Sequence, residues 1–176
     1  LNDSPRTGLR EIVREAEITR ALTVEDVVFK IGPRINAAGR METGSKAVDL
    51  LVSTDSRLAT GISKEINNFN IERRSVDRII TTEAMRMISE DQRNVNSRTT
   101  VLYNPNWKKG VIGIVASRLI ETYYRPTVIL TESNGFATGS ARSVQGYDLY
   151  QAIESCSDLL ESFGGHMFAA GLTLKK

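Results

Sequence analysis

Histidine and cysteine are almost missing from this chain of 176 residues, which has one of each, His166 and Cys156. A single cysteine excludes an internal disulfide and a zinc site built from thiolates. It fits a reducing compartment, so we expect a cytoplasmic protein. A hydrolytic metal centre needs several carboxylates or histidines that converge on the ion. One histidine, with carboxylates spread along expected helix surfaces, predicts neither that centre nor a Ser/His/Asp triad, so we expect no catalytic residue and no metal ligand here.

Long apolar runs and a strong net charge are missing as well. No stretch approaches the roughly 20 apolar residues that span a bilayer, so we expect no membrane partner. The formal net charge is only +2, which means that a nucleic-acid surface must be a local patch. The chain opens in polar sequence at Leu1 without a methionine, and we interpret it as a fragment of a longer protein.

The first half of the chain is typical of helices. Ser4 and Pro5 predict a helix start, Thr23 predicts a second one, and Asp55 can cap a long helix over residues 55–91. The long helix has a narrow apolar stripe, which suits a helix that lies along a surface or connects two bodies. A coiled-coil dimer is the alternative.

A loop is expected over residues 31–41, because Pro33 predicts that the preceding helix stops there. The loop contains Arg34, Asn36 and Arg40 among small residues. Guanidinium groups match the geometry of phosphate oxygens, so these three residues are candidate phosphate ligands. A surface loop with solvated arginines is the alternative interpretation.

After a polar linker over residues 91–97, the pattern changes to alternating strands and helices. It predicts a small mixed-sheet α/β domain, joined by the long helix to the helical part of the chain. The expected strands are 99–103, 127–131, 135–141 and 171–175, and the expected helices are 111–124 and 148–160.

Three loops of this domain have the composition of anion sites. Lys108 precedes a helix N-terminus, which attracts negative charge. Ser140, Arg142 and Ser143 lie at the end of an expected strand. Gly164-Gly165-His166 is typical of a turn whose N–H groups can point at a phosphate. Each loop alone is also explained by solvated side chains or an ordinary turn, but three in one small domain favour phosphate binding.

Four segments, taken together, resemble RecJ-type proteins of the DHH phosphoesterase superfamily. They are Ile31–Arg40, Gly110–Ser117, Gly139–Ser143 and Phe163–Gly171, in the order seen in that family. The resemblance runs from about residue 5 to the end. It implies that residues 1–54 complete an α/β catalytic domain, 55–96 form a connecting helix and linker, and 97–176 form the DHH-associated domain that grips the substrate.

The resemblance also implies an activity for the whole protein: metal-dependent 5′-to-3′ exonuclease action on single-stranded DNA, in DNA repair and recombination. Mn²⁺ or Mg²⁺ would be held by residues outside this chain. Single-stranded DNA is the expected partner, and other DNA repair proteins are candidate partners. Arg142 and His166 match the substrate-binding motifs, whereas Lys108 stands where the family usually has histidine. A non-catalytic nucleic-acid-binding module and a phosphoesterase of short oligonucleotides are the alternatives.

Overall fold

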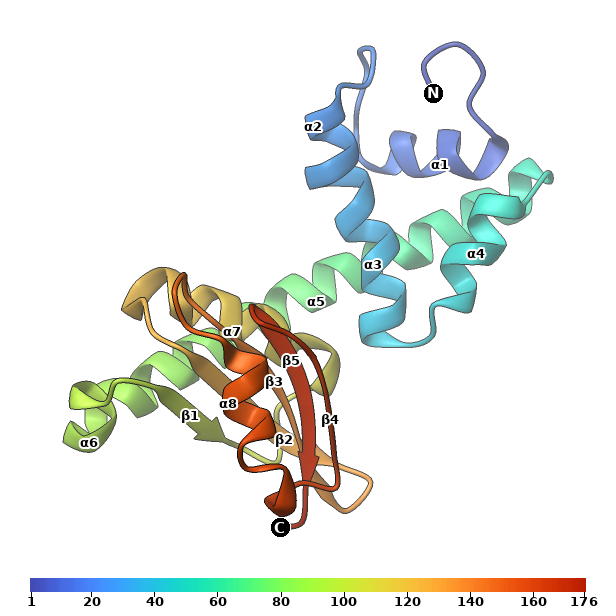
Figure 1. Cartoon of the computed structure of the whole chain (residues 1–176). Helices are drawn as coiled ribbons and strands as arrows, with labels where there is room; N and C mark the ends of the chain where they lie inside the picture. The colour runs from blue at the N-terminus through green and yellow to red at the C-terminus, as the bar shows by residue number, and fades with distance from the viewer. The chain divides into compact units, whose positions relative to one another are not determined.

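The computed structural model describes all 176 residues and divides into two compact units, Leu1–Ser75 and Val76–Lys176 (Figure 1). The boundary falls within one long helix, α5 (Ser56–Glu90), so each unit contains part of it. None of the helices is both long enough and apolar enough to cross a membrane.

The first unit is entirely helical, and a glycine contact joins two of its helices. A Cβ built on Gly8 of α1 would lie 1.7 Å from the carbonyl oxygen of Leu50 in α4, so only glycine allows these helices to approach so closely. Helix α1 begins after Arg6, not after Ser4 as expected. The helices that accompany α5 are α1 (Thr7–Glu15), α2 (Val24–Asp26), a π-helical turn (Val27–Ile31), α3 (Gly32–Met41) and α4 (Ser45–Val52). The core consists of Ile12, Ile31, Ala38, Ala47, Leu50, Ala59 and Ile66.

The expected loop over residues 31–41 is wrong, because these residues form helix α3. Pro33 is the second residue of α3, and its fixed φ suits a helix. A π-helical turn, Val27–Ile31, comes directly before it, and such a turn is a common way to bend a helix. Proline therefore marks a change of helix type here, not a break.

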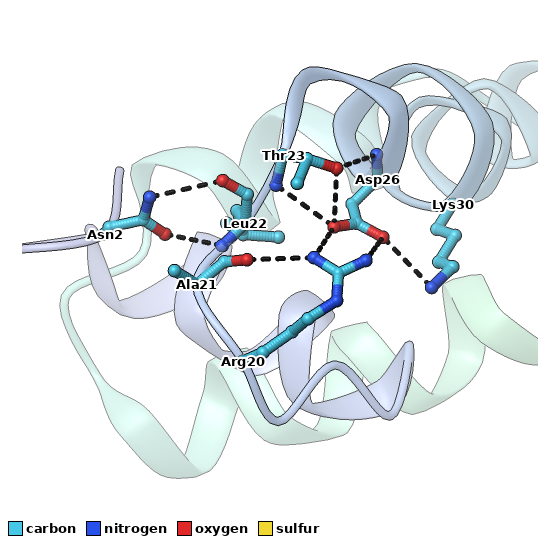
Figure 2. Close-up of polar contacts among 7 residues, drawn as sticks. All are labelled: Asn2, Arg20, Ala21, Leu22, Thr23, Asp26 and Lys30. Carbon is cyan, nitrogen blue, oxygen red and sulfur yellow. Dashed lines mark hydrogen bonds and ion pairs between the residues drawn. The ribbon is translucent and has the colours of Figure 1, made fainter.

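A buried carboxylate, Asp26, ties the start of this helical segment to the preceding loop (Figure 2). It accepts hydrogen bonds from the Thr23 backbone N–H at 3.0 Å and from the Thr23 hydroxyl at 2.9 Å. Two cations also bind it, Arg20 through Nη1 at 2.6 Å and Lys30 through Nζ at 3.0 Å. The Thr23 backbone N–H, followed by the Lys30 and Arg20 side chains, holds the pKa of Asp26 well below its usual value.

The cap of the long helix is as expected. Asp55 Oδ1 accepts hydrogen bonds from the N–H groups of Arg57 at 2.7 Å and Leu58 at 3.0 Å. The linker after α5 differs from expectation because it contains a short helix, α6 (Gln92–Asn96), which Asp91 caps through the Arg93 N–H.

The second unit contains a five-stranded mixed sheet in the order β1-β2-β3-β5-β4. β1 and β2 are parallel and are connected through helix α7, and the other neighbouring strands are antiparallel. The strands are β1 (Thr100–Tyr103), β2 (Thr127–Ser133), β3 (Phe136–Arg142), β4 (Ser162–His166) and β5 (Ala169–Leu174), and the helices are α7 (Lys109–Tyr123) and α8 (Leu149–Glu154). Helix α8 is shorter than expected, and a 3₁₀ turn (Ser157–Leu159) follows it.

The two helices α7 and α8 cover opposite faces of the sheet. Alternate residues of a strand point to opposite faces. A Cβ on Gly113 of α7 would lie 2.9 Å from Ser140 Oγ and 3.0 Å from Arg142 Nη2, so α7 is on the face of these two residues. Ala141, between them, packs with Leu149 of α8. In Figure 1, α8 lies in front of the sheet, on the face to which Ala141 points.

The expected turn at Gly164-Gly165-His166 is also wrong. These residues end strand β4, and the turn lies two residues later, at Met167 and Phe168, since His166 pairs with Ala169 of β5. The close approach of β4 to β5 requires glycine at Gly165, where φ is +153° and a Cβ would lie 2.2 Å from the Ala169 carbonyl oxygen. Glycine here allows strand pairing, not chain reversal.

Candidate nucleic-acid interface

Strand register brings the predicted residues of the second unit onto one face of the sheet. Arg142 and His166 both pair with Ala169, so their side chains point to the same side, two strands apart. Neighbouring strands lie about 4.8 Å apart, which separates the two Cα atoms by about 10 Å. In the next row on the same face, Ser140 and Gly164 both pair with Gly171. This shared surface is called the cradle face below.

Arg142 is held in place by its own strand. Its Nη1 donates to Ser140 Oγ at 3.1 Å and to the Ala141 carbonyl oxygen at 2.8 Å. The absence of a side chain on Gly113 gives the guanidinium room against the second turn of α7. A guanidinium and a hydroxyl side by side suit an anion on this face of the sheet.

The ring of His166 is oriented by its own hairpin. Its Nδ1 accepts a hydrogen bond from the Phe168 backbone N–H at 3.2 Å. A nitrogen that accepts carries no proton, so in the neutral ring the proton is on Nε2. His166 is solvent-exposed, and its Nε2–H can therefore donate to a phosphate oxygen on the cradle face.

Bare backbone forms the floor beside these side chains, in the row of Ser140, and only the methyl group of Ala169 stands between Arg142 and His166. A Cβ on Gly164 would have no atom within 4 Å, and one on Gly171 would meet only the Gly139 carbonyl oxygen at 3.9 Å. Both glycines are exposed. A chain with polar groups along its backbone can therefore approach the sheet more closely here than side chains would permit.

Lys108 stands at the N-cap of α7, and the loop before it is anchored to α5. Glu83 accepts hydrogen bonds from the Trp107 indole Nε1–H at 2.8 Å and from Asn104 Nδ2 at 2.9 Å. Trp107 is only 4% exposed, and its carbonyl oxygen accepts a bond from Thr131. The loop lines a hollow of about 520 Å³ together with part of α5. Trp107 is thus a buried anchor that sets the position of Lys108.

Ser143 differs from the other predicted residues because its polar groups bind within the protein. Its N–H donates to the Phe168 carbonyl oxygen at 2.9 Å, and its hydroxyl donates to the Tyr147 carbonyl oxygen at 2.7 Å. The first bond joins the loop after β3 to the tip of the β4–β5 hairpin, and the second closes that loop on itself.

The three predicted residues of the first unit lie on helix α3, not in a loop. Arg34 is half-buried and donates to Asn67 Oδ1 at 3.0 Å and to the Lys30 carbonyl oxygen at 2.9 Å. Burial, and then the charge of Arg74, lower the pKa of Arg34 from its usual value. Asn36 and Arg40 are exposed and, four residues apart, share one side of the helix. Arg34 lies two residues before Asn36, which places the Arg34 side chain on the opposite side of the helix.

Several contributors to this site were not predicted from the sequence. Gly113 makes room for Arg142, Gly171 forms part of the floor, and Glu83 anchors the loop before α7. Gly113 and Gly171 lie inside motifs that point to phosphate binding, and the motif spacing is the signal that could have found them. Glu83 lies in no such motif, and only its hydrogen bonds to the loop before α7 show that it supports the site.

No group of three or more histidine, cysteine, aspartate or glutamate side chains in the chain is arranged to hold a metal ion. The residues present therefore do not fit a catalytic Mn²⁺ or Mg²⁺ centre, which needs several such ligands.

Comparison with known proteins identifies the second unit first. Residues 96–176 match the family described as the DHHA1 domain, so this part of the chain is a DHHA1 domain. The chain is 40% identical over 179 residues to the single-stranded-DNA-specific exonuclease RecJ of Bacillus subtilis, and 33% identical over 182 residues to RecJ of Escherichia coli. These alignments cover 99% and 97% of the chain, but 22% and 31% of the relatives.

A solved structure agrees. RecJ from Thermus thermophilus in complex with Mn²⁺ superposes with a TM-score of 0.85 at 31% identity, over 98% of this chain and 25% of that one. Nearly the whole chain is therefore similar to one part of RecJ, and it spans about a quarter of the length of such proteins. The family resemblance and the fold class, an α/β domain with a long helix and a helical unit, are confirmed.

Proposed function

We propose that this chain is the strand-holding portion of a metal-dependent exonuclease that degrades single-stranded DNA from its 5′ end in DNA repair and recombination. The observation that carries the proposal is the cradle face, where Arg142, Ser140 and His166 surround bare glycine backbone beside the second turn of α7. Donors of this kind suit phosphate oxygens of a nucleic-acid backbone. Lys108, and Asn36 and Arg40 of the first unit, are further proposed phosphate contacts.

The proposed role is positioning. The guanidinium of Arg142 supplies charge-assisted hydrogen bonds to a phosphate, and the oriented Nε2–H of His166 supplies another. Fixing a strand relative to a reacting centre can lower the barrier of a reaction by several kcal/mol. Relatives of this family have been solved with Mn²⁺ or Mg²⁺. The metal centre is proposed to lie in the part of the whole protein outside these residues.

Binding of a fluorescently labelled single strand, measured by anisotropy over a salt series, tests the proposal. For single strands, log K falls with log[salt] with a slope of about −0.7 for each phosphate neutralised. We expect Arg142→Gln to weaken binding about tenfold or more and to reduce that slope by about 0.7. Arg86→Gln is the matched control, since Arg86 pairs with Glu90 on α5, and it should bind like the parent chain. Equal effects of the two substitutions would refute the role of the cradle face.

A further inference from the structure

The ring of Phe168 lies beside the cradle face, next to His166, and phosphate binding does not explain its exposure. Phe168 at the tip of the β4–β5 hairpin is 48% exposed, and Tyr147 in the loop after β3 is 40% exposed. Ser143 ties the backbones of the two residues together, through its N–H to Phe168 and its hydroxyl to Tyr147. An aromatic ring that is half-exposed beside a polar site offers a flat apolar face to a ligand bound there.

The ring of Phe168 is next to His166, which is a proposed phosphate contact. Its centroid lies 6.5 Å from that of the His166 ring, in an edge-to-face arrangement. The Phe168 N–H is also the group that orients the histidine, at 3.2 Å from Nδ1. A nucleotide whose phosphate contacts His166 therefore has its base within reach of this ring.

The hairpin tip is held firmly, although its loop lacks the usual tight-turn geometry. A two-residue hairpin favours positive φ in the turn, but neither Met167 nor Phe168 has one. Three hydrogen bonds compensate: the Phe168 N–H to His166, the Ser143 N–H to the Phe168 carbonyl and the Leu149 N–H to the Met167 carbonyl at 3.1 Å. The aromatic ring is thus presented from a fixed backbone, which reduces the entropy lost when a ligand binds.

We propose that the Phe168 ring forms a base-stacking subsite for single-stranded nucleic acid, beside the phosphate contacts of Arg142 and His166. This inference rests on the proposed function. Aromatic side chains stack on bases with little preference for sequence, because every base has a π face. The subsite would therefore favour unpaired bases without selecting a sequence, and a base inside a duplex could not reach the ring.

Two strands with the same number of phosphates test the subsite: an ordinary single-stranded oligonucleotide and an abasic one that keeps the sugar-phosphate backbone. We expect the parent chain to bind the abasic strand roughly tenfold more weakly. Phe168→Ala should bind both strands as weakly as the parent chain binds the abasic strand, with an unchanged salt slope. Phe168→Tyr keeps an aromatic ring and should keep the preference for the ordinary strand over the abasic one. Met167→Ala, a neighbouring non-aromatic residue that is 39% exposed, is the control and should keep the preference.

The outcomes separate this inference from the proposed function. If Arg142→Gln weakens binding but Phe168→Ala retains the preference for bases, the stacking subsite is refuted and the phosphate contacts stand. If the parent chain binds neither strand, both proposals are refuted. Circular dichroism of Phe168→Ala checks that the fold is intact, and Phe168→Leu provides a second variant that keeps apolar volume without an aromatic face.

Discussion

Gly164 and Gly165 are neighbours in strand β4, yet we expect their substitution by alanine to have opposite consequences. A Cβ on Gly165 would lie 2.2 Å from the Ala169 carbonyl oxygen and 2.6 Å from the Ala170 Cα, and these are backbone atoms that cannot swing away. Its φ of +153° is also unfavourable for alanine. Overpacking costs about 1–3 kcal/mol and backbone strain a further 1–3 kcal/mol. The sum is a large part of the roughly 5–15 kcal/mol that stabilises a domain.

Alanine at Gly164 meets no atom within 4 Å, and the backbone there has no positive φ. Gly164→Ala should therefore change the free energy of unfolding by less than about 1 kcal/mol, and the sign can be stabilising because the unfolded chain loses freedom. The new methyl group stands on the floor of the cradle face. It should push a bound strand away from the backbone and weaken DNA binding about tenfold, the value of one hydrogen bond to a charged group.

The assay pairs urea unfolding, followed by circular dichroism, with anisotropy of a labelled single strand for both variants. Gly165→Ala should lower the urea midpoint clearly, and Gly164→Ala should keep the midpoint and lose affinity. Unchanged DNA binding by a folded Gly164→Ala variant would refute the assignment of this face. An unchanged midpoint for Gly165→Ala would refute the account of strand pairing.

Three further predictions concern residues that support the site and the fold. Gly113→Ala should leave thermal stability within about 1 kcal/mol, since alanine is the better helix former, but should weaken strand binding up to about tenfold by displacing Arg142. Glu83→Ala should lower the free energy of unfolding by about 1–3 kcal/mol, seen in urea melts, because it leaves the buried Trp107 N–H without its partner. Because the pKa of Asp26 is depressed in the folded state, its stabilising effect is complete above the unfolded pKa of about 3.9 and is lost as the pH falls below it. Asp26→Asn should therefore flatten the acid side of a stability–pH profile.

The sequence predicts the elements that have clear apolar periodicity. The errors fall where glycine or proline is compatible with more than one backbone structure. Helix α5, its Asp55 cap and strands β2 and β3 follow from apolar spacing and local capping. Helix α3 does not follow from the sequence, because Pro33 predicts a break, whereas a proline at the start of a helix is compatible with it. Strand β4 was missed because two glycines favour a turn locally, and pairing with β5 overrides that preference.

The candidate site shows the same limit. Residue type and motif point to Arg142 and His166, but their placement on one face depends on the register of β3, β5 and β4. These strands are neighbours in the sheet, whereas β3 and β5, which pair, are not consecutive in the chain. Such nonlocal pairing has no signal in local spacing. Arg34 shows the reverse case: it is close to Asn36 and Arg40 in the sequence, but helical geometry places its side chain toward Asn67.

Single-strand affinity of His166→Gln, compared with the parent chain over a salt series, tests the central claim most directly. The ring is exposed and its Nδ1 bonds only a turn N–H, so the variant should stay folded and its effect should report on ligand contact. We predict weaker binding of single-stranded DNA, by roughly tenfold, with an unchanged unfolding midpoint. Affinity equal to that of the parent chain at every salt concentration would contradict the proposal that this face holds the strand.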